Sequence, residues 1–295
     1  MSIEQIGQDV PARIDAPAPA VARPLGAGPF GAMLASRAGL AVVQAVILAV
    51  IIAAWQAVAD GMHTEFWTSS PLGVARALAK WWSSGTLTTD LRLTLFEAGC
   101  GFVAGSLAGG IVGFVLGWIR GLGDVFEPFV LSLYTLPKIA LAPLFVLWFG
   151  IGPLNKVMFA GLLVFFMVFF TTFQGIRQVD RDIVANARLL GASRAQIWTK
   201  IAMPYAAVWI FTGLRIGLPY ALIGAIVGEF VAADSGVGFR IKESTSYFDT
   251  AGVFAGLVVL MAVSLLFLGL LKIVERHVLR WQDPGMTVTA PDHQA

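Results

Sequence analysis

Six long apolar stretches constrain this chain more than any other feature of its sequence. Each is close to the ~20 residues that an α-helix needs to cross a bilayer. We expect spans at residues 39–59, 93–118, 126–149, 154–175, 204–232 and 252–274. Because no water reaches the hydrocarbon core, each span must satisfy its own backbone hydrogen bonds, as a helix does. The sequence therefore predicts an all-α membrane protein with six transmembrane helices.

The composition supports this fold class. Hydrophobic residues make up 57% of the chain and charged residues only 13%, whereas ordinary soluble domains are about 25% charged. Such a chain is too apolar to stay disordered and has too few charges to cover a large soluble core. The net charge of +2 argues against a nucleic-acid partner. We therefore expect the chain to be embedded in a lipid bilayer.

The distribution of lysine and arginine predicts the orientation of the spans. Six spans put both termini on one side, and the segments on that side carry about twice as many Lys and Arg residues as the opposite segments. Five of them lie in one loop, namely Arg177, Arg181, Arg188, Arg194 and Lys200. Because positively charged loops tend to stay in the cytoplasm, both termini are predicted to be cytoplasmic.

The ends of the chain differ from its middle. Residues 1–36 are rich in Ala, Pro and Gly and lack an apolar period, which predicts a flexible cytoplasmic tail. The membrane domain is expected at residues 37–282, and a second flexible tail at residues 283–295. One cysteine, Cys100, and three scattered histidines indicate neither an intrachain disulfide nor a metal site.

The second span carries a glycine at every fourth position. These glycines are Gly101, Gly105, Gly109, Gly113 and Gly117. Residues four apart share one face of a helix, so a second backbone can approach this face closely. We interpret the glycines as a helix-packing surface and not as part of a transport route.

Three ionisable residues stand out as candidates for intramembrane charges: Lys138, Arg215 and Glu229. Intramembrane charges are costly unless they are paired or hydrated. Beside Lys138, Pro137 and Pro143 favour a break in the third span, and broken helices often border cavities. We therefore keep two interpretations. Lys138, Pro143, Arg215 and Glu229 line a translocation pathway, or the charges have structural partners such as a carboxylate, backbone carbonyls or a second copy.

The loop between the fourth and fifth spans has the features of a rigid elbow (residues 180–203). Asp180 or Asp182 can cap a first helix, and Gly191 permits a sharp turn. Ser193 and Gln196 form a capping box for a second helix that leads to Pro204. Such an elbow suits mechanical coupling to a cytoplasmic partner, although a simple connecting loop is the alternative.

At this loop the chain resembles the permeases of ABC importers. Their "EAA loop" has the spacing of Ala185, Asn186, Ala187, Gly191, Ile201, Met203 and Pro204. The second Ala, Gly, Ile and Pro of that motif are present, whereas Ala185 stands for its Glu, Asn186 for its first Ala and Met203 for its Leu. Further segments resemble the nitrate/sulfonate/taurine group of these permeases, namely 137–152, 188–192, 212–216, 227–230, 236–238 and Trp281. The resemblance covers about residues 70–282; one departure is Glu97, where the group often has an Arg.

The resemblance implies a type I ABC importer permease fold in a bacterial cytoplasmic (inner) membrane. It implies a second permease copy, as a homodimer, two ATPase subunits and an extracytoplasmic substrate-binding protein. The implied ATPase-coupling residues are Ala185, Asn186, Ala187, Arg188, Gly191, Ala192, Ile201 and Pro204. ATP and Mg would be bound by the ATPase. No lysine here follows a glycine, so the G-x-x-x-x-G-K-[ST] loop is absent, and we expect no catalytic residue, cofactor or metal in this chain.

The implied solute is small and anionic, such as nitrate, a sulfonate or taurine. A heterocyclic vitamin precursor is the alternative substrate. A secondary transporter or channel is an alternative class, and it predicts inverted repeats and paired intramembrane acids. We find no convincing repeat, and Glu97 and Glu229 form no obvious pair in the sequence. A structural membrane subunit is the third possibility.

Overall fold

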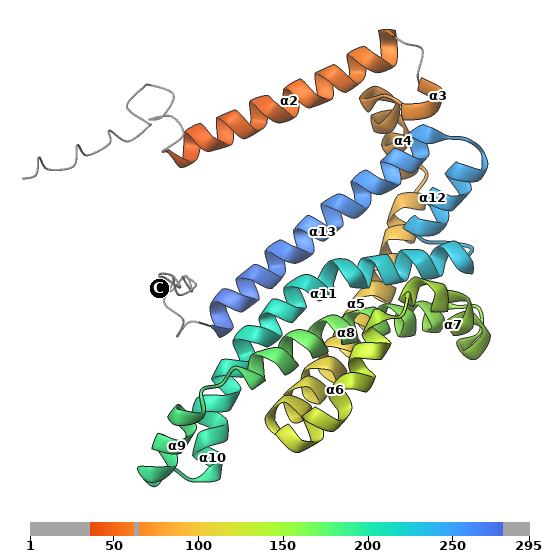
Figure 1. The fold of residues 1–295 in the computed structure, drawn as a ribbon. Coiled ribbons are helices and arrows are strands. Elements are labelled where there is room, and N and C mark those ends of the chain that lie inside the picture. The colour runs from red at the N-terminus through yellow and green to blue at the C-terminus, as the bar shows by residue number, and fades with distance from the viewer. Residues whose placement is uncertain (1–35, 62–64, 280–295) are drawn as a thin grey trace, which may run out of the picture. The chain divides into compact units, whose positions relative to one another are not determined.

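The structure is a computed structural model that describes residues 36–61 and 65–279. All regular elements within these ranges are helices (Figure 1). In chain order they are α2 (Arg37–Gly61), α3 (Glu65–Thr68), α4 (Pro71–Ser83), α5 (Thr86–Trp118), α6 (Arg120–Thr135), the 3₁₀ helix η1 (Lys138–Leu141), α7 (Ala142–Phe149), α8 (Pro153–Arg177), α9 (Arg181–Leu189), α10 (Arg194–Ile197), the π-helix η2 (Trp198–Ala202), α11 (Met203–Val231), α12 (Val237–Ser246) and α13 (Thr250–Val278). Apart from Ser36, the predicted terminal tails lie outside the described residues, as does Trp281.

The chain divides into two compact units between Ala57 and Val58. Most of the described part of the first unit is α2, which contains the predicted span 39–59. Its side chains are apolar and mostly exposed, as expected of a helix whose solvent is lipid.

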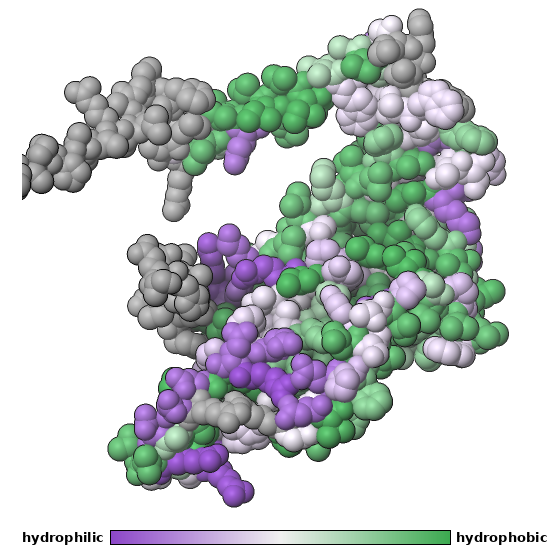
Figure 2. Space-filling model, viewed as in Figure 1, coloured by the Kyte–Doolittle hydropathy of each residue, from purple (hydrophilic) through white to green (hydrophobic). Residues whose placement is uncertain are grey.

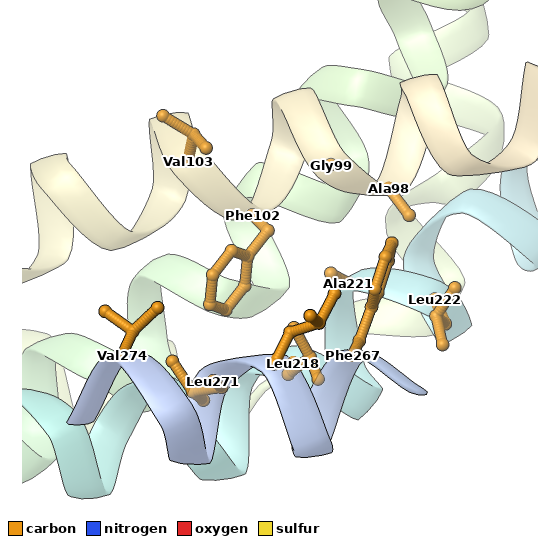
Figure 3. A pocket seen from close by; sticks show the side chains of 11 residues that line it. Ala98, Gly99, Phe102, Val103, Leu218, Ala221, Leu222, Phe267, Leu271 and Val274 are labelled. Carbon is orange, nitrogen blue, oxygen red and sulfur yellow. The ribbon is translucent and has the colours of Figure 1, made fainter. Parts of the chain in front are cut away.

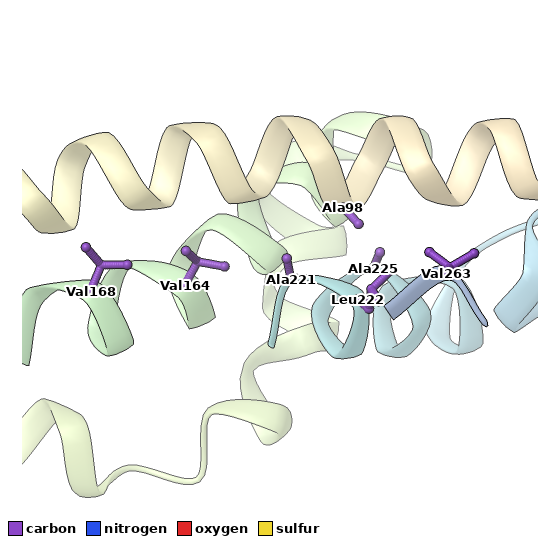
Figure 4. Close-up of a cluster of buried hydrophobic side chains, with 7 residues drawn as sticks. All are labelled: Ala98, Val164, Val168, Ala221, Leu222, Ala225 and Val263. Atoms are coloured by element: carbon purple, nitrogen blue, oxygen red, sulfur yellow. The ribbon is translucent and has the colours of Figure 1, made fainter. Parts of the chain in front are cut away.

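The second unit is a helical bundle with α8 at its centre. More than half of the most apolar stretch of α8 is buried, against about a tenth for α13. Alanine, valine and leucine side chains of α5, α8 and α11 meet in its main hydrophobic cluster, joined by one residue of α13 (Figure 4). The cluster consists of Ala98, Val164, Val168, Ala221, Leu222, Ala225 and Val263. Alanine and valine allow these helices to pack closely, as is common in membrane bundles.

Five helices in the described ranges are long and apolar enough to cross a membrane, and a sixth span is present if one bent helix pair is counted. Five predicted spans coincide with α2, α5, α8, α11 and α13, so the all-α, six-span prediction is confirmed in this sense. Hydrophilic side chains gather at the end of the second unit that carries α9 and α10 (Figure 2).

The third span, predicted over residues 126–149 with a break favoured by Pro137 and Pro143, is a sharply bent pair of segments that begins about five residues earlier than predicted. Two segments, Gly121–Thr135 and Lys138–Phe149, meet at 81°. The break contains Pro137, which lacks a backbone N–H and restricts the residue before it. By contrast, Pro143 occupies the first turn of α7, where its missing N–H is tolerated. Pro143 therefore begins a helix and does not kink one.

Candidate coupling elbow and intramembrane charges

The elbow is built from two capped helices and a glycine turn. Asp180, and not Asp182, is the N-cap of α9: its carboxylate accepts the N–H of Asp182 at 2.8 Å. Gly191 adopts φ +84°, a left-handed conformation that favours glycine. The capping box of α10 is complete, because the Ser193 N–H donates to the Gln196 side chain at 2.8 Å and the Gln196 N–H donates back at 3.3 Å.

The tip of the elbow exposes large apolar side chains. Leu189 and Leu190 are 85% and 88% exposed, and Ile183 is also uncovered. Ala185 and Asn186, at the positions of the motif's Glu and first Ala, are exposed as well, whereas Ala187 is half-buried. Most of this end of the unit is hydrophilic (Figure 2). Leu189 and Leu190, with Ile183, therefore form a small apolar patch within a polar surface.

An aromatic cluster anchors the base of the elbow. Trp198 of η2 lies edge-on to Phe114 and Trp118 of α5, with ring centroids 5.2 and 5.4 Å apart. Beside it, Ile197 and Ala202 are buried. A π-helix within a longer helix is frequently functional. The elbow is therefore joined to both α5 and α11, a connection that the loop sequence alone did not predict.

The glycine face of α5 lies against α8. A Cβ atom added at Gly105 would come within 2.3 Å of the Gly161 carbonyl oxygen, and one added at Gly109 within 2.5 Å of the Phe165 carbonyl oxygen. Gly101, Gly113 and Gly117 are also buried, and a Cβ on each would meet α8 within 3 Å. Only glycine fits these positions at the observed helix separation.

Lys138 lies at the break of the third span. Its ammonium group donates to the Tyr134 carbonyl oxygen at 2.5 Å and lies 4.4 and 4.9 Å from the ring centroids of Tyr134 and Phe166. Among the described residues, no carboxylate forms an ion pair with Lys138. Within the part of the chain that the structure describes, its positive charge is therefore held by a carbonyl and two rings and not by a carboxylate.

The other candidate pathway charges have structural partners and do not converge on Lys138. Arg215 of α11 forms an ion pair with Glu275 of α13. Glu229 is fully buried and accepts a hydrogen bond from the Thr94 hydroxyl at 2.6 Å and one from the Gly238 N–H. For these two residues the contacts match the alternative of a structural partner.

A buried charge cluster (Glu97, Lys156 and Glu229) joins three helices at the end opposite the elbow. Lys156 of α8 forms an ion pair with Glu97 of α5 at 3.1 Å, with both side chains at most 3% exposed. Glu229 of α11 interacts with both residues. Lys156 lies near the start of the predicted fourth span and was not among the candidate charges. The sequence also showed no obvious pairing of the two acids, although Glu97, the departure from the permease group, was a signal of an unusual contact.

The start of α12 is bound to the same region. The N–H groups of Gly236 and Val237 donate to the Asp90 carboxylate at 3.0 Å and to the Thr94 hydroxyl at 2.9 Å. Arg240 donates to Asp90 at 3.0 Å. Burial disfavours its charge, but Asp90 and Glu243 outweigh that effect and raise the pKa of Arg240. These contacts explain the Gly-Val-Gly sequence, because a Cβ at Gly236 would lie 2.3 Å from the Glu229 carboxylate.

A hollow of about 240 Å³ lies between α5, α11 and α13 (Figure 3). Its lining side chains are apolar throughout, with Phe102, Leu218 and Phe267 among them. A site for an anion needs donors or positive charge. The hollow is therefore a poor candidate for the solute site.

The fold and these sites define a helical, multi-pass membrane transport component with a projecting elbow. Residues 101–280 match the family described as "Binding-protein-dependent transport system inner membrane component". The chain belongs to this family, and it is accordingly a multi-pass inner-membrane permease subunit of the ABC importer type.

Two relatives cover most of the chain. It is 32% identical over 236 residues to the "Putative aliphatic sulfonates transport permease protein SsuC" of Bacillus subtilis (strain 168), covering 80% of this chain and 86% of the relative. It is 37% identical over 238 residues to the "Riboflavin transport system permease protein RibX" of Chloroflexus aurantiacus, covering 80% and 89%. The crystal structure of an amino acid ABC transporter has a similar fold, with a TM-score of 0.53, 17% identity, and coverage of 70% of this chain and 98% of that chain.

Proposed function

We propose that this chain forms the translocation pathway of an importer that is powered by a separate ATPase. The observation that carries the proposal is the elbow, a rigid projection with Leu189 and Leu190 exposed at its tip and an aromatic anchor at its base. Two such subunits would bind two ATPases, which hold the ATP and Mg, on the cytoplasmic side. A binding protein would deliver the solute to the opposite side.

The class of a secondary transporter is less well supported. That class predicts paired intramembrane acids, and Glu97 and Glu229 do interact, but a pair that binds a coupling ion or proton must also be free of other partners. Here Glu97 and Glu229 share Lys156 as a counter-ion, and Glu229 also accepts two hydrogen bonds. Both acids are therefore engaged in holding helices together.

For the solute we propose a small anion such as a sulfonate, with Lys138 as the pathway residue that attracts it. The support is the position of Lys138 at the break of the third span, where it pairs with no carboxylate of the described residues, together with the similarity to the sulfonate permease. Similarity to the riboflavin permease keeps a heterocyclic vitamin precursor as the alternative.

Uptake into proteoliposomes tests both parts of this proposal. With the permease, its ATPase and its binding protein reconstituted together, we expect taurine or ethanesulfonate uptake that requires ATP. Lys138→Met should lower it about tenfold, the effect of losing ~1.4 kcal/mol of attraction, whereas Lys138→Arg should retain most of it.

The matched control is Lys272→Met, which removes an exposed lysine of α13. Uptake without ATP would contradict the proposed class. Equal sulfonate uptake by wild type and Lys138→Met would contradict the role of Lys138. Riboflavin uptake in place of sulfonate uptake would favour the alternative substrate.

A further inference from the structure

Arg177 connects the base of the elbow to α6. It is the last residue of α8 and lies three positions before the N-cap of α9. The two ends of its guanidinium group bind different carboxylates, one from Asp124 and one from Glu127, which are three residues apart on α6. The guanidinium carbon also lies 5.0 Å from the centroid of the buried Phe173 ring.

This arrangement differs from an ordinary surface ion pair. An exposed pair contributes little, because solvent screens it and two long side chains must be ordered. Here the carboxylates are exposed, at 64% for Asp124 and 41% for Glu127, but the Arg177 side chain is only 22% exposed and both ends of its planar fork are engaged. A ring beneath the guanidinium further fixes its position.

Few other contacts hold α6 to the bundle. Gly123 is its one buried residue among those whose burial the structure describes. Val130 is half-buried against the cluster of Leu116, Phe169 and Phe173, and the Tyr134 ring lies edge-on to Phe170, with centroids 4.5 Å apart. Large apolar residues elsewhere on α6, such as Val125 and Phe129, are more than 60% exposed. A helix with so few buried contacts moves more readily than the core of a bundle, so its ion pairs with Arg177 have a large share in setting its position.

The far end of α6 leads directly into the break of the third span. The helix ends at Thr135, and Pro137 and Lys138 follow at once. We propose that the Arg177 link (Arg177 with Asp124 and Glu127) transmits displacement of the elbow to α6 and, through α6, to this break. This inference rests on the proposed function, because it assumes that an ATPase moves the elbow. Arg177 is then a positioning residue that controls the pathway from outside it.

Thiol labelling at the break tests the link in the complete complex. Leu136, next to Pro137 and 47% exposed, is replaced by cysteine in a Cys100→Ser background, and N-ethylmaleimide labelling is measured without nucleotide and after trapping with ATP and vanadate. In the otherwise wild-type complex we expect labelling rates to differ about fivefold between the two states, the lower range of typical coupling between sites.

Arg177→Met, and separately Asp124→Asn with Glu127→Gln, should abolish this difference while the ATPase remains bound and active. The charge-reversed triple variant Arg177→Glu, Asp124→Lys, Glu127→Lys should restore it, which a misfolded protein would not do. Lys272→Met is the matched control and should keep the full difference.

The outcomes separate the link from the proposed function. A nucleotide-dependent difference that persists in Arg177→Met overturns the link alone. The link alone is also overturned if the complex with an otherwise wild-type permease binds the ATPase but labels Leu136→Cys at the same rate in both nucleotide states. If wild type recovers no ATPase at all, the proposed function is overturned, and the link with it.

Discussion

Replacing Gly105 by leucine is expected to prevent α5 and α8 from packing together. A Cβ atom at this position would lie 2.3 Å from the Gly161 carbonyl oxygen and 2.9 Å from the Val164 Cβ. Backbone cannot yield as a flexible side chain does, so the helices would have to separate. We expect a loss of about 3 kcal/mol or more in the free energy of unfolding, the upper range for overpacked cores.

Gly99→Leu provides the matched control for this prediction. Gly99 lies on the same helix, and a Cβ added there would meet no atom within 4 Å. The measurement is the thermal unfolding midpoint of the detergent-purified protein, with the monodisperse yield. We expect Gly99→Leu to resemble wild type and Gly105→Leu to be recovered poorly or not at all. Equal stability of the two variants would show that the glycine face does not set the distance between α5 and α8.

Removing the positive charge of Lys156 is expected to destabilise the protein by a similar amount. Lys156→Met would leave Glu97 without its ion-pair partner while that side chain remains fully buried. Glu229 would lose the same counter-ion. Breaking one partner of a buried pair typically costs about 3–5 kcal/mol, because an uncompensated charge stays in the low-dielectric interior. Chemical denaturation in detergent measures this cost.

A second substitution distinguishes lost charge balance from lost packing. Adding Glu97→Gln to Lys156→Met removes the unpaired charge of Glu97 with little change in shape, while Glu229 keeps its hydrogen bonds from the Thr94 hydroxyl and the Gly238 N–H. We expect the double variant to recover most of the lost stability, since neutral replacements of a buried ion pair are often tolerated. A single variant as stable as wild type, or a double variant no better than the single one, would contradict the role of the buried charge cluster.

Local signals in the sequence predicted much of this fold. The length and apolar character of α2, α5, α8, α11 and α13 follow from the physics of a bilayer, which acts on each span separately. Helix capping is also local, so Asp180, Gly191 and the Ser193–Gln196 capping box predict the elbow from the sequence alone. These features need no knowledge of neighbouring helices.

Contacts between residues that are far apart in the sequence could not be predicted from such local signals. Lys156 lies one turn inside α8, and no local signal indicates its partner Glu97, which is 59 positions away in the sequence. Similarly, Arg215 gave no sign that Glu275 lies beside it, and Trp198 none of its contact with α5. The sharp bend at Pro137 was underestimated, because proline marks a break without setting its angle.

The most direct measurement of the central claim is recovery of the ATPase with the tagged permease when the elbow tip is altered. Leu189→Asp with Leu190→Asp places two charges in the exposed apolar patch at the elbow tip and alters no buried side chain of the bundle. We predict that recovered ATPase falls at least about tenfold, since each leucine contributes ~1.5 kcal/mol or more when buried by a partner. Leu189→Met with Leu190→Met, which stays apolar, should recover wild-type amounts. Undiminished ATPase recovery by the double-aspartate variant would contradict the claim that this elbow is where the motor engages the permease.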